Sequence, residues 1–206
     1  MYQPTKLGEP PRQARKAWKE FMSTVPESHS LRHFFYEVVS SHFDSDLGLR
    51  DSEMQSYIAN MLADFCDTTE LYKIRDAAGR PLHDVGEMLL ESDPVFGDAP
   101  SFDRERQVRK HIGDFTLFFT GMFPESINNH RLRRHRLENF VDWMKAGKES
   151  YYIVSKFEHF EYARVAPLFA KLARNFEECV FGLNMVKNDL RERQHPIMRK
   201  TDELLM

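Results

Sequence analysis

Apolar residues recur at three- and four-residue spacing along most of the chain, and this spacing limits the fold more than any other feature. Such a period places the apolar side chains on one face of a helix, whereas a strand needs a period of two. Strand-like alternation never extends beyond three residues. The sequence therefore predicts an all-α protein.

Proline, glycine and serine positions divide the helical pattern into a bundle of seven or eight helices. The clearest apolar periods cover residues 13–23, 29–43, 52–75, 82–92, 102–123, 139–161 and 167–193. Short connections favour antiparallel packing of neighbouring helices, and no linker separates two cores. We expect residues 1–206 to form a single helical domain, with loosely ordered tails at 1–12 and 196–206.

Size and composition restrict the class of protein. A chain of 206 residues is long enough to bury roughly 70% of its unfolded surface without a disulfide. Its two cysteines, Cys66 and Cys179, are expected to be reduced thiols in a cytoplasmic protein. The formal net charge of −3 argues against a nucleic-acid partner. No run of 18 apolar residues occurs and the polar N-terminus lacks a secretion signal, so we expect no membrane contact.

Familiar catalytic motifs are missing from the sequence. The chain has no glycine-rich dinucleotide fingerprint, no Walker-type phosphate loop, no Gly-x-Ser-x-Gly elbow and no His-Glu-x-x-His motif. Asp44, Asp46 and Asp51 resemble part of a calcium loop. That loop requires glycine at its sixth position and glutamate at its twelfth, which are here Leu49 and Gln55.

The segment 102–123 is the most apolar helix, and different side chains gather on its different faces. One face holds large apolar residues, and a second holds the small residues Gly113, Thr116 and Thr120. Two such faces predict a central helix that contacts neighbours on most sides. The small face predicts close approach by the helix at 139–161, where Gly147 supplies a matching surface.

His111 and Asp114 lie on the third face of this helix, and Glu125 follows just after it. Residues three apart on a helix are adjacent, and a carboxylate beside an imidazole can fix its tautomer or share a metal ion. We therefore take His111, Asp114 and Glu125 as candidate ligand-binding residues. Two other interpretations stay open: an ion pair at the rim of the bundle, and a buried pair that gives packing specificity.

Two further groups are weaker candidates. His29 and His33 are four residues apart and can face one metal ion, so they join His111 and Asp114 as possible metal ligands. A run of arginines is the candidate for binding phosphate groups or an acidic partner, with solvated surface charge as the alternative. This run consists of Arg131, Arg133, Arg134 and Arg136.

In length and number of helices the chain resembles the broad class of helical bundles that includes haem oxygenases and thiaminase-like enzymes. A haem-oxygenase-like site implies an axial histidine on an early helix, for which His29 or His33 is the candidate. The matching glycine-rich distal helix is not found in the sequence. A thiaminase-like site implies a nucleophilic cysteine, but neither Cys66 nor Cys179 has an electropositive context.

These observations favour a non-enzymatic helical protein that acts through protein contacts and self-associates as a homodimer. The 17 Phe and 10 Met exceed what one small core needs, and the charged end of the helix at 167–193 is expected to leave the core. Under this hypothesis the chain has an unidentified protein partner and no cofactor. The alternative is a bundle, with or without enzymatic activity, that binds a small molecule, a metal ion or haem at His111 and Asp114.

Overall fold

The structure is a computed structural model, and it describes residues 31–94, 101–127 and 139–193. Every regular element in these ranges is helical, which confirms the predicted all-α bundle. The elements are α2 (Leu31–Ser45), α3 (Ser52–Asp64), α4 (Thr68–Leu71), α5 (Val85–Ser92), α6 (Phe102–Met122), α7 (Pro124–Ile127), α8 (Phe140–Val154), the 3-10 helix η2 (Phe160–Arg164), α9 (Ala166–Arg174) and α10 (Phe176–Arg193). The expected helix at 13–23 and both expected tails lie outside the described residues. Within the described ranges, no helix combines the length and the apolar character needed to cross a membrane.

Polar side chains define where four of the helices begin. Asp51, Asp84, Ser101 and Asn139 accept hydrogen bonds from backbone N–H groups in the first turns of α3, α5, α6 and α8. These N–H groups have no partner within the helix, so an oxygen acceptor at this position stabilises the helix end. Between α4 and α5 the chain turns at Gly79, whose φ of 78° is a conformation that residues with a side chain rarely adopt.

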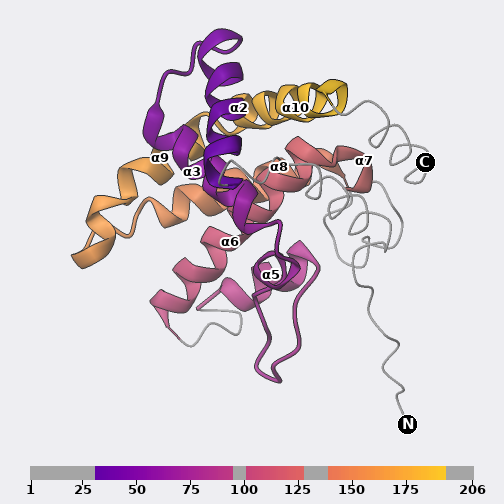
Figure 1. The fold of residues 1–206 in the computed structure, drawn as a ribbon. Helices are drawn as coiled ribbons and strands as arrows, with labels where there is room; N and C mark the ends of the chain where they lie inside the picture. The colour runs from indigo at the N-terminus through magenta and orange to yellow at the C-terminus, as the bar shows by residue number, and fades with distance from the viewer. Residues whose placement is uncertain (1–30, 95–100, 128–138, 194–206) are drawn as a thin grey trace.

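Helix α6 is the centre of the bundle, as its sequence predicts. Every residue from His111 to Phe123 is buried, and α5, α8 and α10 all pack against this helix. Figure 1 shows α5 and α10 on opposite sides of α6. Polar groups on the second half of α6 are therefore enclosed by protein, whatever their chemical role.

The most extensive helix contact joins α6 to α8, and it confirms the predicted role of the small residues. A Cβ atom at Gly113 would overlap the ring of Tyr151, and one at Gly147 would overlap Thr116 and the ring of Phe176. Glycine thus lets the two backbones approach each other. The space above each glycine is filled by a large side chain from a neighbouring helix, which keeps the interior densely packed.

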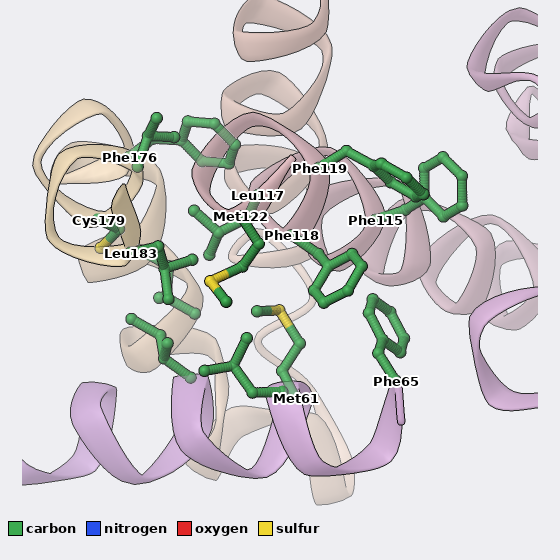
Figure 2. Close-up of a cluster of buried hydrophobic side chains, with 14 of the residues drawn as sticks. Met61, Phe65, Phe115, Leu117, Phe118, Phe119, Met122, Phe176, Cys179 and Leu183 are labelled. Carbon is green, nitrogen blue, oxygen red and sulfur yellow. The ribbon is translucent and has the colours of Figure 1, made fainter. Parts of the chain in front are cut away.

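Phenylalanine and methionine side chains fill the space between α3, α6 and α10. Figure 2 shows Met61 of α3, and Phe65 just after the end of α3, extending toward Phe118 of α6, with side chains of α10 beside them. The rings of Phe65 and Phe118 meet edge to face with their centroids 5.3 Å apart. One buried cluster takes up most of these side chains, and among the described phenylalanines Phe102 and Phe181 are the exposed ones. The expectation that they exceed the needs of one core is therefore wrong for this part of the chain.

The expected helix at 167–193 is two helices, because the chain bends at Asn175. The backbone of Asn175 has φ −104° and ψ 29°, and its side-chain amide donates to the carbonyl of Lys171 at 2.9 Å. Asparagine makes such local hydrogen bonds readily and thereby interrupts a helix. In a similar way α8 ends at Val154 instead of residue 161, and the Ser155 hydroxyl donates to the carbonyl of Tyr152 at this end.

The last turns of α10 stay in the core, contrary to the expectation that they leave it. Val186 and Leu190 are buried. Lys187 is buried as well, and its ammonium group donates to both carboxylate oxygens of Glu125 at 3.0 and 2.8 Å. The last turns of α10 are thus covered within one chain, so they give no reason of their own for a dimer.

Candidate functional site

A buried carboxylate lies where α3, α6 and α8 meet. Asp114 Oδ1 accepts hydrogen bonds from the hydroxyls of Tyr57 at 2.5 Å and Tyr151 at 2.8 Å. Asp114 Oδ2 accepts from the ammonium group of Lys110 at 2.6 Å. The Asp114 side chain is 4% exposed, whereas the Lys110 side chain is 35% exposed and connects the group to solvent. We call these four residues the Asp114 cluster.

The Asp114 cluster is a set of donors around one acceptor. Burial, and after it the negative charge of Asp114, raises the pKa of both Tyr57 and Tyr151 well above the usual value of 10.0. Both hydroxyls therefore keep their protons and donate to the carboxylate. Hydrogen bonds to an ionised acceptor are stronger than neutral ones, and the Lys110 ammonium compensates the buried charge. This arrangement is typical of a buried polar group that determines how α3, α6 and α8 pack against one another.

His111 lies one turn before Asp114 but has different neighbours. Its ring packs against Phe65 and Phe115, with centroid distances of 5.8 and 5.9 Å. Burial lowers the pKa of His111 from 6.5 to about 4, while the charge of Asp114 opposes this change. Neither ring nitrogen of His111 makes a hydrogen bond of normal geometry. The backbone carbonyl of Leu71 has only a small effect, which favours the protonated imidazole. The imidazole is therefore neutral at pH 7.

The structure does not bring His111, Asp114 and Glu125 together as one set of ligands. Asp114 binds the two tyrosines and Lys110, His111 lies among phenylalanine rings, and Glu125 pairs with Lys187 of α10. In the part of the chain that the structure describes, no three His, Cys, Asp or Glu side chains are grouped so as to hold a metal ion.

The remaining candidates from the sequence lie mostly outside the described residues. His33 is on α2, where its side chain is 57% exposed and pairs with Glu37 at 3.3 Å. Its expected metal-binding partner, His29, is outside the described ranges. The whole arginine run is outside them too: Arg131, Arg133, Arg134 and Arg136. Both cysteines are free thiols, as expected, and burial raises the pKa of the Cys179 thiol.

A groove with a volume of about 650 Å³ lies between α8 and α9. Long polar side chains form its α8 wall, and small residues with one arginine form its α9 wall. The lining residues are Lys145, Lys148, Glu149, Tyr152, Ser155, Lys156, Ala170, Ala173 and Arg174. A second hollow of about 290 Å³ shares three of these residues and continues along α9 past Ala166 and Pro167. We call the two hollows together the α8–α9 groove.

Positive charge predominates in the α8–α9 groove, although the whole chain carries a net charge of −3. Lys148 pairs with Glu177 of α10 at 2.7 Å. Lys145 and Arg174 are exposed and have no acidic partner among the described residues. The groove therefore offers two cations that an anionic ligand can pair with, which no group in the Asp114 cluster does.

Tyr152 is the aromatic side chain of the α8–α9 groove. Adjacent residues on a helix point about 100° apart, so Tyr151 turns into the core while Tyr152 remains 55% exposed. The ammonium group of Lys156 lies 4.6 Å from the centroid of the Tyr152 ring, within the range of a cation–π contact. An exposed aromatic ring and positively charged side chains therefore line the same groove.

No family model, curated protein or solved structure matches this chain. The resemblance to haem oxygenases and thiaminase-like enzymes gains no support from these comparisons. Among the described residues, those of the Asp114 cluster and the α8–α9 groove therefore give the main indication of function.

Sequence reasoning found Asp114 but missed its partners. Tyr57 and Tyr151 are 57 and 37 positions away from it, and no local pattern connects them. Lys110 was missed as well, although a lysine four residues before an aspartate on a helix is a recognisable ion pair. The α8–α9 groove was missed entirely, since it exists only after the two helices pack.

Proposed function

We propose that this chain is a binding module that recognises another protein at the α8–α9 groove and acts through that contact rather than by catalysis. The observation that carries the proposal is the groove itself, in which Tyr152 is 55% exposed and Lys145 and Arg174 have no acidic partner among the described residues. Tyrosine and arginine are enriched in protein interfaces, and residues of these types contribute much of the binding energy.

The buried polar groups support the same proposal. Asp114 accepts hydrogen bonds from Tyr57, Tyr151 and Lys110, and Glu125 accepts from Lys187. Groups engaged with one another in this way stabilise the packing of helices. Side chains that are available to a ligand are found instead on the outer faces of α8 and α9.

Self-association and a cytoplasmic location belong to the same proposal. The free thiols of Cys66 and Cys179 fit a reducing compartment. Phe181 on α10 is 58% exposed and is a candidate contact for a second copy of the chain. Because a second copy can also occupy the α8–α9 groove, the test has to separate a homodimer from a different partner.

Photo-crosslinking in living cells of the source organism tests the proposal. Benzoylphenylalanine replaces Tyr152 in the groove or, as a matched control, Phe102, which is 71% exposed and does not line the groove. We expect a discrete crosslinked product at position 152 that disappears when Lys145→Glu and Arg174→Glu are added. Mass spectrometry then identifies the product, and a mass of twice 24.4 kDa indicates a homodimer. Equal crosslinking from positions 152 and 102, or none from either, would contradict the proposal.

A second candidate function is binding of a small molecule, a metal ion or haem beside His111. It is supported by the two ring nitrogens of His111, which lack normal hydrogen-bond partners inside the core. The test is thermal unfolding in the presence of zinc, ferrous iron or haem. A ligand at 100 times its Kd adds about 2.7 kcal/mol of stability, and His111→Leu should abolish this gain. A melting temperature that none of the three moves contradicts this candidate.

A further inference from the structure

The α8 wall of the α8–α9 groove presents a single row of side chains. Lys145, Lys148 and Tyr152 follow one another at spacings of three and four residues, so they lie on one face of α8, and Lys156 continues the row in the turn just after the helix. With a rise of 1.5 Å per residue, this row is about 16 Å long. A ligand that contacts the whole row must extend over about three helical turns.

The α9 wall is low because most of the residues that form it are small. Leu168, Phe169 and Leu172 of α9 are buried in the core. The groove is lined on this side by Ala166, Pro167, Ala170 and Ala173, of which Ala166 and Ala173 are themselves buried, and at one end by Arg174. A row of long side chains facing a row of short ones leaves an apolar floor that another backbone can approach closely.

Cations without an acidic partner among the described residues lie at one end of the groove, where Lys145 and Arg174 share a hollow. The hollow at the other end is lined by both Lys156 and Glu158, and Glu149 lines the groove between the two ends. A complementary ligand therefore carries acidic groups opposite Lys145 and Arg174 and near Lys156, and apolar or basic groups near Glu149 and Glu158.

We propose that the ligand of the α8–α9 groove is an acidic amphipathic helix of a partner protein, about three turns long. This inference rests on the proposed function and adds the chemistry and conformation of the ligand. The apolar side of the helix covers the alanines of α9 and the ring of Tyr152. Its acidic residues pair with Lys145, Arg174 and Lys156.

A helical ligand suits this groove better than an extended peptide. An extended peptide gains its affinity from backbone hydrogen bonds to a sheet edge, and every regular element in the described ranges is helical. A helix satisfies its own backbone groups and needs only side-chain contacts. The ridges and grooves of α8 and α9 accept a third helix by the same packing that joins the helices of the core.

A protein ligand also suits this groove better than a nucleic acid. Single-stranded nucleic acids bind by stacking several bases on several aromatic side chains. Here the groove has one aromatic residue, Tyr152, and the ammonium of Lys156 already lies over its ring. Glu149 would repel a continuous phosphate backbone, and the net charge of −3 gives no long-range attraction for one.

Selection from a phage-displayed library of random peptides of about 16 residues tests the inference on the full chain. The selected peptides are labelled and their Kd is measured by fluorescence anisotropy. We expect them to be acidic, to carry apolar residues at helical spacing, and to become helical on binding, as seen by circular dichroism. Lys145→Glu with Arg174→Glu should raise Kd at least about tenfold, and Tyr152→Ala should do the same.

The control variant is Arg50→Glu with Lys73→Glu. Both residues are exposed and outside the groove, and the pair has the same residue types and the same change of charge. The control variant should leave Kd within about twofold. Circular dichroism of each variant without peptide confirms that the fold is intact.

Each other outcome overturns a defined part of the argument. Peptides that bind the groove but are basic, neutral or extended overturn the acidic helix and leave the proposed function standing. If the Kd of every selected peptide is unchanged by Lys145→Glu with Arg174→Glu, this contradicts both the acidic helix and the proposed function. If a 20-nucleotide oligothymidine binds the unmodified chain and this binding is lost in the same variant, the groove is a nucleic-acid site instead. A dimer in light scattering that the same variant dissociates identifies a second copy as the occupant.

Discussion

Replacing His111 with leucine should remove a large part of the acid sensitivity of the folded state. Burial lowers the pKa of His111 from 6.5 to about 4 in the folded protein. Between these two values the unfolded chain binds a proton at this position and the folded chain does not. Stability contributed by the neutral imidazole is therefore present above pH 6.5 and is lost as the pH falls toward 4. The lost free energy of unfolding between pH 7 and pH 5 is about 2 kcal/mol.

Urea unfolding at a series of pH values measures this effect. The free energy of unfolding of the unmodified chain should fall more steeply from pH 7 to pH 5 than that of His111→Leu, by about 2 kcal/mol. Leucine is close in size and suits the phenylalanine surroundings of position 111, and a change in absolute stability does not affect the comparison of slopes. His33→Leu is the control, because its side chain is 57% exposed. Parallel curves for the unmodified chain and His111→Leu would refute the reasoning.

Three further predictions concern packing and assembly. Asp114→Ala leaves the buried hydroxyls of Tyr57 and Tyr151 without their acceptor, so it should lower the free energy of unfolding in urea by about 3–5 kcal/mol. A smaller loss than that caused by Tyr151→Phe would contradict the central role of Asp114 in the Asp114 cluster. Gly113→Leu should lower the melting temperature, with a cost of at least about 1–3 kcal/mol, because its side chain would overlap the Tyr151 ring; an unchanged value would mean that α6 and α8 are farther apart. Light scattering should give a mass of twice 24.4 kDa if the chain forms the proposed homodimer, whereas a constant mass of 24.4 kDa at all concentrations would rule it out.

The sequence predicted the centre of the fold because local spacing determines it. Apolar and small residues on separate faces of the segment 102–123 require neighbours on most sides, and every residue from His111 to Phe123 is buried. The contact of Gly113 with α8 followed from the same spacing. Patterns of this kind depend on residues within a few turns of one another, which a sequence displays directly.

The bend at Asn175 was not predicted, because the apolar period continues across it. Leu172, Phe176 and Cys179 keep the spacing of one helix, and all three are buried. Neither glycine nor proline marks the bend; the side chain of Asn175 makes it by bonding to the carbonyl of Lys171. Asparagine occurs inside many helices, so its presence alone does not predict an interruption.

The candidate sites were predicted less well than the fold, since they depend on residues far apart in the chain. The histidine next to Asp114 in the helical pattern is not its partner, and the tyrosines that bind it come from α3 and α8. In the same way, Lys145, Tyr152 and Lys156 look like an ordinary solvated face of a helix. Only their position opposite the alanines of α9 makes them one wall of a groove.

The glycines at the helix crossings have a consequence for related sequences. Gly113 lies against the ring of Tyr151 and Gly182 against the ring of Phe43. In each pair the ring occupies the volume that a side chain at the glycine position would need. A related chain that replaces one of these glycines with alanine needs a smaller residue at the facing position. The two positions of each pair should therefore covary. Glycine on one helix paired with a ring on the next is a pattern that can identify relatives even where overall sequence identity has fallen too low for alignment.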